Sequence, residues 1–429
     1  MGVKRAICFF FILASFLVLI VLLPTFIYKK SVQNENKIIA AEQEAQKKDD
    51  FLLKVQEPSE AKILIITFNL NDTGAPLMFL YLTQMLHQRG YNVFLLTYAG
   101  GRHEEDLKKE NIPYLISKDF FYNAEEAENL FSSFDVVISG RIPQIYTPSQ
   151  EHKFIWWDHG LLDCVPMFFF QGREIGKNNP MRDIKFLIFE AKDVVFVSEL
   201  QQQKLAKCRK FSSEVIHNGI NPTGIDMDDP VTKKIIEAKK AGKTVFVTVG
   251  YIAPIKGQDI LVNAIELLPD EYRRKTSFFI VGSEQDKDYF IRLREKSKNM
   301  PEIIWTGPVL HEKIGGIYES ADVLLSPSRS DTAPLVVQEA AEHYTPSVIT
   351  ENMGSTYIIQ DGKSGFIIPI EDPQSLMEKI KFFVDNPDKI KDFGKVGRQN
   401  YEKYSSFDTF IKKWEDKIKR KLKEVKGRK

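Results

Sequence analysis

The chain has 429 residues, which is long for a single globular core and favours two domains. Lys and Arg number 59 against 58 Asp and Glu, and this balance argues against a dedicated nucleic-acid-binding protein, which carries a basic excess. Hydrophobic residues make up 43%, which argues against wholesale disorder. The three cysteines form no CxxC pair, so the sequence predicts neither a zinc site nor a disulfide framework.

The first apolar segment, Ile7–Ile27, contains no charged residue and has two basic residues near each end. A helix of about 20 residues spans about 30 Å, the thickness of the hydrocarbon layer. We therefore expect residues 1–30 to hold one transmembrane anchor, with a cleaved signal peptide as the alternative. The flanking charges do not fix its orientation. The polar residues 31–58 are expected to form a stalk or tether.

From residue 59 the pattern changes to apolar, β-rich runs that alternate with amphipathic segments. Met78–Arg89 has apolar residues at helical spacing. Strands alternating with helices predict βαβ units and a parallel sheet, here a Rossmann-like domain over residues 59–222. Five strands are expected in it: Ile63–Phe68, Val93–Thr97, Val136–Ser139, Phe154–Trp157 and Val194–Val197.

Proline and glycine cluster in residues 223–242, which we interpret as a domain linker. Alternation then resumes and predicts a second Rossmann-like domain over residues 243–395. Its expected strands are Thr244–Val249, Ser277–Val281, Val323–Leu325 and Ser347–Thr350. Its expected helices are Ile260–Leu268, Tyr289–Lys296, Pro334–Glu342 and Pro373–Val384.

The last segment, residues 396–429, combines an amphipathic helix with a basic end. Apolar residues recur at helical spacing from Phe407 to Leu422, and Lys417–Lys429 is strongly basic. A packed helix with a solvated polar face is the simpler interpretation. The alternative is that the basic end rests on anionic lipid.

Two common nucleotide-binding motifs are absent from the sequence. Gly242-Lys243-Thr244 lacks the earlier glycine of a P-loop and precedes a strand instead of following one. No G-x-G-x-x-G follows the first strand of either domain, which disfavours a dinucleotide oxidoreductase. No H-E-x-x-H motif is present, although His311-Glu312 occurs.

Two turns of the second domain carry the groups that a sugar nucleotide needs. Lys256 lies in the turn after the first strand, where a cation can reach a phosphate. Pro334 suits a first helical turn, so the amides of Leu335 and Val336 would be unpaired and available to a diphosphate. Asp331 and Glu339 flank them and can bind a hexose and a ribose. Taken singly, each residue also fits a structural role: a solvated lysine, a helix-capping Asp331 and a buried structural Glu339.

Seven short pieces stand out between residues 61 and 395. They are Asp72-Thr73-Gly74-Ala75-Pro76, Asp158-His159-Gly160, Val197-Ser198-Glu199, His217-Asn218-Gly219-Ile220, Lys256-Gly257-Gln258-Asp259, Asp331 with Glu339, and Asp361-Gly362-Lys363-Ser364-Gly365-Phe366. In these pieces the chain resembles the retaining GT-B glycosyltransferases of group 1, family 4. The pieces occur in the family's order over about 330 residues, and this order is more specific than any one piece.

The resemblance implies an α/β GT-B fold, in which two Rossmann-like domains face each other and the last helix crosses back to the first domain. It implies that His159 approaches the transferred sugar, that Asp331 binds sugar hydroxyls and that Glu339 binds the ribose. The remaining donor-binding residues that it implies are Gly74, Asn218, Lys256, Arg329, Leu335 and Val336. No metal ligand and no cofactor are implied.

Three positions depart from the family pattern. Tyr251 stands where an arginine is usual, Asp331 where a glutamate is usual, and Tyr344 where a glycine is common. Arg329 is the candidate to replace the missing phosphate-binding cation.

We therefore expect a membrane-anchored, metal-independent, retaining hexosyltransferase that acts on a glycan or lipid-linked saccharide. The basic tail favours catalytic domains on the cytoplasmic face. Front-face substitution is favoured, and Asp158 is the one nearby carboxylate that could serve as a nucleophile instead. The alternatives are a tethered pseudo-enzyme that binds sugar nucleotides, and a GT-B epimerase or phosphorylase.

Overall fold

The computed structural model describes residues 42–428, apart from residues 60, 72–73, 119, 121–122, 141–147, 161–191 and 208–211. The chain forms two compact units, Met1–Pro58 and Ser59–Lys429. In the first unit, residues 42–56 are helical, whereas the expected anchor over residues 7–27 lies outside the described residues. Across the part of the chain that is described, no helix is both long and apolar enough to cross a membrane.

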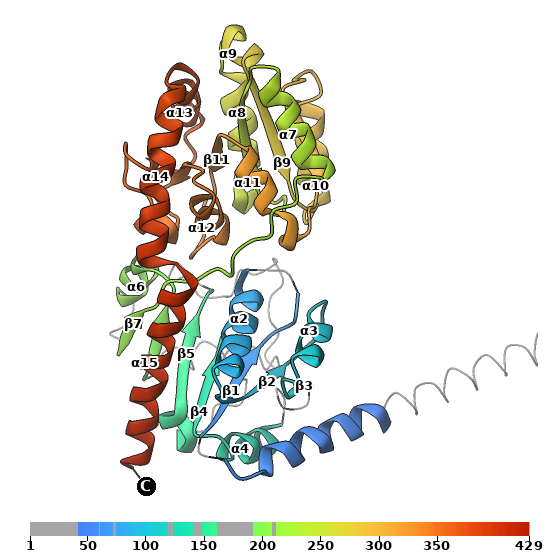
Figure 1. Ribbon diagram of the computed structural model, residues 1–429, viewed down its shortest axis with the longest axis vertical. Coiled ribbons are helices and arrows are strands. Elements are labelled where there is room, and N and C mark those ends of the chain that lie inside the picture. The colour runs from blue at the N-terminus through green and yellow to red at the C-terminus, as the bar shows by residue number, and fades with distance from the viewer. Residues whose placement is uncertain are drawn as a thin grey trace, which may run out of the picture. The chain divides into compact units, whose positions relative to one another are not determined.

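The second unit begins with a seven-stranded parallel sheet in the order β3-β2-β1-β4-β5-β6-β7 (Figure 1). Its strands are β1 (Lys62–Thr67), β2 (Asn92–Thr97), β3 (Tyr114–Ile116), β4 (Val136–Ser139), β5 (Phe154–Asp158), β6 (Val194–Phe196) and β7 (Ser213–Val215). Its helices are α2 (Gly74–Gln88), α3 (Glu104–Lys109), α4 (Ala124–Ser132) and α6 (Glu199–Ala206). The five expected strands are confirmed to within one residue, and the two additional strands, β3 and β7, have three residues each.

A six-stranded parallel sheet follows, in the order β10-β9-β8-β11-β12-β13. Its strands are β8 (Thr244–Val249), β9 (Thr276–Val281), β10 (Ile303–Gly307), β11 (Val323–Ser326), β12 (Ser347–Thr350) and β13 (Gly365–Ile368). Its helices are α7 (Pro230–Lys240), α8 (Gln258–Glu266), α9 (Asp270–Arg274), α10 (Lys287–Lys296), α11 (Gly315–Ser320), α12 (Leu335–Glu342) and α13 (Pro373–Asp385).

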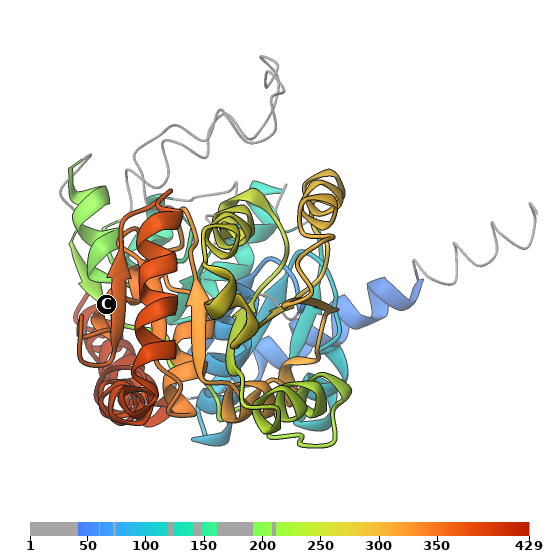
Figure 2. The same cartoon turned by 90° about the horizontal axis from the view of Figure 1, so that it is seen from above.

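Both faces of the six-stranded sheet are covered by helices (Figure 2). Along β8, Val245 and Val247 join the apolar cluster with α7, α11 and α12, whereas Phe246 joins the cluster with α8, α10 and α13. This alternation is the two-residue period of a strand, and burial on both sides explains its continuous apolar run.

The range expected to be a linker, residues 223–242, contains helix α7, which corrects that interpretation. Asp229 caps the helix by accepting hydrogen bonds from the amides of Val231 and Thr232, and Pro230 occupies its first turn. Ile235 is fully buried in the core. The proline that suggested a break therefore starts a helix that belongs to the second domain.

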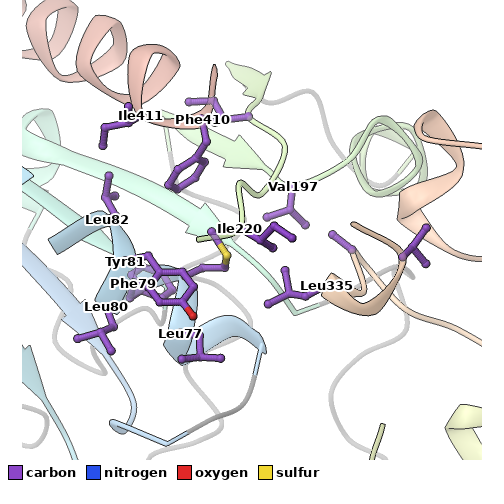
Figure 3. Close-up of a cluster of buried hydrophobic side chains, with 14 of the residues drawn as sticks. Leu77, Phe79, Leu80, Tyr81, Leu82, Val197, Ile220, Leu335, Phe410 and Ile411 are labelled. Atoms are coloured by element: carbon purple, nitrogen blue, oxygen red, sulfur yellow. The ribbon is translucent and has the colours of Figure 1, made fainter. Parts of the chain in front are cut away.

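Helices α14 (Pro387–Tyr404) and α15 (Phe407–Lys426) carry the chain from the six-stranded domain back to the seven-stranded one (Figure 1). The ring of Trp414 lies 4.6 Å from that of Trp157 at the end of β5. Phe410 and Ile411 join the same apolar cluster as residues of α2 and as Leu335 of α12 (Figure 3). The expected return of the last helix is confirmed, and it joins both domains through one continuous core.

Candidate functional site

The strand order of the second domain reverses between β8 and β11, and Lys256 and Asp331 follow these two strands. The chain leaves β8 toward β9 on one side and β11 toward β12 on the other. Parallel sheets bind ligands outside the carboxyl ends of the strands at such a point. Nζ of Lys256 lies 2.6 Å from Oδ2 of Asp331, so the structure brings these two predicted donor residues together.

Charge holds the Lys256–Asp331 pair in place. Their side chains are only 20% and 17% exposed. Burial by itself lowers the pKa of Lys256, but the charge and hydrogen bond of Asp331 outweigh it, and the net pKa is raised. Lys256 also lies 5.0 Å from the ring centre of Tyr251, the residue at the usual arginine position. The ammonium is therefore charged and has an aromatic neighbour in place of a second cation.

The backbone around Lys256 requires a glycine at the next position. Gly257 has a φ of 70°, in the left-handed region, and a Cβ there would lie 2.0 Å from the carbonyl oxygen of Pro327. The turn after β8 thus approaches the loop after β11 too closely for any side chain. This close approach sets the spacing of Lys256 and Asp331.

The guanidinium of Arg329 is paired with carboxylates of the same domain, whereas a phosphate-binding role would leave it available to the donor. Its guanidinium binds the Asp259 carboxylate through two hydrogen bonds of 2.9 and 2.7 Å, and it also pairs with Glu371. It further donates to the carbonyl of Pro254, at the start of the Lys256 turn. Arg329 therefore braces this turn, while its contact with a donor stays a prediction.

Glu339 lies in α12 and is 3% exposed. Its two carboxylate oxygens are contacted by Nε2 of His311, at 2.9 Å, and by the hydroxyl of Tyr318, at 2.8 Å. Burial and the Glu339 charge raise the pKa of Tyr318, so this hydroxyl remains a donor. Sequence reasoning missed both partners. His311-Glu312 was considered only as part of a metal motif, and no sequence pattern singled out Tyr318.

His159 follows β5 and is tied to the Asp331 loop, because the hydroxyl of Thr332 donates to its carbonyl over 2.8 Å. Its ring lies against Trp157, 4.6 Å between ring centres. Burial lowers the pKa of His159 to about 3, so the imidazole is neutral. Its Nε2 is buried and has no hydrogen-bond partner among the residues that the structure describes. Such an atom suits a hydroxyl of a bound sugar.

Burial raises the pKa of the neighbouring Asp158 to about 6, against the opposing hydrogen bond from the Gly160 amide. The carboxylate is therefore largely ionised at neutral pH and largely protonated below pH 6. This is the group that could compete as a nucleophile.

Gly74 and Leu335 meet across the two domains. A Cβ placed on Gly74, the first residue of α2, would lie 3.9 Å from the Leu335 side chain. Leu335 and Val336 form the first turn of α12, whose amides have no partner within the helix. The first turns of α2 and α12 therefore lie next to each other, beside the apolar residues drawn in Figure 3.

Asn218 lies in the loop that passes under α15. A Cβ on the adjacent Gly219 would lie 2.3 Å from Cβ of Phe410, which fixes this loop against the helix. Asn218 is 2% exposed, and its Oδ1 has no partner within the described ranges. Its place in a donor site stays a prediction.

Tyr344, at the position where a glycine is common, has a φ of 58°. This left-handed conformation suits glycine and strains a residue with a side chain. The Tyr344 ring is 55% exposed and lies 5.6 Å from the guanidinium of Arg398. Tyr344 therefore adopts a backbone conformation that a glycine would adopt without strain.

Comparison with known proteins gives the family of the second domain. Residues 231–400 match the family described as Glycosyl transferases group 1. The second domain is thus similar to the group 1 glycosyltransferases over these 170 residues. This similarity agrees with the resemblance that the sequence pieces carry.

Two curated transferases are similar to this chain over a limited length. The D-inositol 3-phosphate glycosyltransferase of Streptomyces scabiei is 25% identical over 202 residues, which cover 44% of this chain and 45% of the relative. The sulfoquinovosyl transferase of Arabidopsis thaliana is 28% identical over 165 residues, 38% of this chain and 31% of the relative. The chain thus spans less than half the length of these relatives.

Solved glycosyltransferase structures share the fold over nearly all of the second unit. Anabaena HepE, solved in complex with UDP-glucose, matches with a TM-score of 0.68 at 16% identity, over 84% of this chain and 100% of that one. A glycosyltransferase of Rickettsia africae matches with a TM-score of 0.67 at 18% identity, over 85% and 100%. The two Rossmann-like domains are therefore those of GT-B-type structures.

Proposed function

We propose that this protein is a retaining hexosyltransferase that uses a nucleotide-diphosphate sugar and transfers its hexose to a glycan or lipid-linked saccharide. The observation that carries the proposal is the Lys256–Asp331 ion pair at the strand-order reversal of a group 1 domain. Lys256 would contact the diphosphate and Asp331 the hexose hydroxyls. Glu339 would accept hydrogen bonds from the ribose.

The same residues support a reaction without a metal ion. The leaving diphosphate develops negative charge, and Lys256 together with the first amides of α12 would stabilise it. These groups are fixed before the reaction, so they need no reorganisation when the charge forms. Neutral His159, with its orphaned Nε2, would hold the hexose.

We propose front-face substitution, in which the acceptor hydroxyl attacks the anomeric carbon from the side on which the diphosphate leaves. Transfer of the hydroxyl proton to the departing phosphate oxygen balances the step. Asp158 is the rival nucleophile. A glycosyl adduct trapped on Asp158 and detected by mass spectrometry would replace this mechanism with a double displacement.

We also propose that the uncharged run over residues 7–27 anchors the protein in a membrane with its catalytic domains on the cytoplasmic face. Support comes from the length of the run and from the basic end of the chain. An anchor would place the protein beside lipid-linked acceptors. Protease protection of the full chain in membrane vesicles tests the orientation.

The proposal is tested with a panel of UDP-, GDP- and ADP-sugars, supplied with membrane extracts as a source of acceptor. The expected result is release of nucleoside diphosphate with one donor and an NMR-determined product that keeps the donor's anomeric configuration. Lys256→Met should remove this turnover, whereas the exposed control Lys287→Met should not. An inverted product would contradict retention. Donor binding with no turnover on any acceptor would favour the pseudo-enzyme. Rapid epimerisation of the donor in the absence of an acceptor would favour the epimerase.

A further inference from the structure

Three side chains lie in a row at the carboxyl edge of the seven-stranded sheet, after β1, β2 and β3. Phe68 and Tyr98 directly follow Thr67 and Thr97, which are paired across β1 and β2. Their rings are stacked, with centres 5.1 Å apart and planes 9° from parallel. Lys118 follows the next strand, β3, and its Nζ lies 5.7 Å from the centre of the Tyr98 ring.

The backbone under this row is fixed. The amide of Ala99 donates to the carbonyl of Phe68 over 3.0 Å, and the amide of Ser117 donates to that of Thr97, also over 3.0 Å. A Cβ on Gly101 would lie 2.3 Å from the carbonyl of Leu70, so the loops after β1 and β2 touch directly. The rings therefore have a defined position that needs little ordering when a ligand binds.

The row presents apolar surface and charge together. Phe68 is 38% exposed, in contrast to the fully buried aromatic residues of the core. The Lys118 side chain is exposed, and no carboxylate pairs with its ammonium in the described parts of the chain. Single exposed apolar residues are common, but a stacked aromatic pair beside an unpaired cation is an arrangement suited to binding.

The loop that carries Tyr98 also reaches the donor domain. Arg102, four residues on, forms an ion pair of 2.5 Å with Glu312 of the second domain. His311, the residue before Glu312, contacts Glu339. The aromatic row and the expected ribose contact are thus linked through two adjacent residues, which places the row on the side of the first domain that faces the donor.

We propose that Phe68, Tyr98 and Lys118 form the acceptor subsite and that the acceptor is a pyranose sugar carrying an anionic group, a phosphate or a carboxylate. The assignment of this row as an acceptor site rests on the proposed hexosyl transfer. The C–H groups on one face of a pyranose are apolar and weakly positive, which suits the negative face and the apolar area of an aromatic ring. Lys118 would bind the anion.

The test uses three probe sugars: methyl β-D-glucopyranoside, its 6-phosphate and methyl β-D-glucuronide. Saturation-transfer NMR identifies the sugar protons near the rings, and titration gives each Kd. We expect both anionic sugars to bind about tenfold more tightly than the neutral one, which is the scale of one favourable charge contact. The phosphate and carboxylate arms show which anion is preferred.

Two variants separate the contributions. Phe68→Ala should weaken the binding of all three probe sugars by several fold, and Phe68→Tyr should restore this binding. Lys118→Met should remove the preference for the anionic sugars and leave the neutral sugar unchanged. Thermal unfolding of each variant checks that the fold is kept. No saturation transfer from any probe, or an anion preference that survives Lys118→Met, overturns the proposal.

The donor half of the enzyme serves as the independent readout. UDP-glucose binding should be unaffected by Phe68→Ala and Lys118→Met, and lost in Lys256→Met, which should still bind the anionic probes. Probe binding without any nucleotide-sugar turnover would overturn the proposed function but support the sugar subsite. Nucleotide-sugar turnover with an unchanged acceptor KM in Phe68→Ala and Lys118→Met would support the proposed function and overturn the sugar subsite.

Discussion

Nε2 of His311 lies 2.9 Å from Oε1 of Glu339 and ties the loop after β10 to the middle of α12. The Tyr318 hydroxyl holds the other carboxylate oxygen, so the group is oriented before any donor arrives. Each carboxylate oxygen has more than one acceptor position, which leaves room for a ribose hydroxyl. The pair of donors therefore acts by positioning Glu339.

Removing the Tyr318 hydroxyl should weaken donor binding more than it slows turnover. Tyr318→Phe loses one hydrogen bond to a buried carboxylate, worth about 1.5–3 kcal/mol, or roughly a 10- to 100-fold change in affinity. We expect the donor KM to rise within this range while kcat changes less. Tyr272→Phe is the matched control, because its hydroxyl donates to Asp385 over 3.0 Å at an exposed site. Equal effects of the two variants would count against positioning.

Glu339→Ala should abolish turnover by removing the expected ribose contact. It also leaves the His311 and Tyr318 donors without their buried acceptor, which costs about 1–3 kcal/mol of stability. Glu339→Gln keeps the shape and one acceptor oxygen and should fold more stably than the alanine variant. Steady-state rates and urea unfolding measure both effects. Near-normal turnover of the alanine variant would show that the donor lies elsewhere.

Asp158 and His159 should give opposite pH dependences of stability. Burial lowers the pKa of His159 to about 3, so protonation favours the unfolded chain and stability is lost as the pH falls below 6.5. Burial raises the pKa of Asp158 to about 6, so stability is lost as the pH rises from about 4 through 6.

Two variants measured at pH 5 and pH 8 separate these effects. Relative to the wild type, His159→Asn should gain more in Tm at pH 5, where protonation of the histidine stabilises the unfolded wild type. Asp158→Asn should gain more at pH 8, where the wild type carries a buried negative charge. Tm differences that do not change with pH would mean that neither group is desolvated in the folded protein.

Asp193 should be important for holding α15 on the first domain. It pairs with both Lys417 and Lys421, and the Lys421 ammonium, 3% exposed, lies 2.6 Å from its Oδ2. Asp193→Asn removes the carboxylate that the two ammonium groups share. It leaves Lys417 with Glu214, at 2.8 Å, and the buried Lys421 with only the more distant Glu424 among the described residues. The loss of this partner of a buried charge costs up to about 3–5 kcal/mol.

Urea unfolding monitored by tryptophan fluorescence measures the loss. Glu424→Gln is the control, since this carboxylate is 45% exposed and lies 3.6 Å from Lys421. Its effect should stay within about 1 kcal/mol, as for other exposed pairs. A small effect of Asp193→Asn would indicate that Lys417 and Lys421 are held mainly by packing of their aliphatic parts.

The sequence predicted most strands because their apolar runs are long and buried on both faces, as in β8. It missed β3, β7, β10 and β13. β3 and β7 have three residues each and are partly exposed, so they carry almost no periodic signal, and most residues of β10 are also partly exposed. The cluster of proline and glycine around residue 230 was misinterpreted for a related reason. Pro230 can end a segment or start a helix, and only the packing of Ile235 decides between the two.

By itself, the sequence determined the two α/β domains, the returning helix and the positions of Lys256, Asp331 and Glu339. These follow from local patterns and from motifs at fixed offsets after strands. Only the tertiary structure decided which side chains contact these residues. It paired Lys256 with Asp331, engaged Arg329 with Asp259 and Glu371, and set His311 and Tyr318 on Glu339. Such partners come from strands and loops tens of residues apart, so their meeting depends on strand order and close backbone approach, which no local pattern encodes.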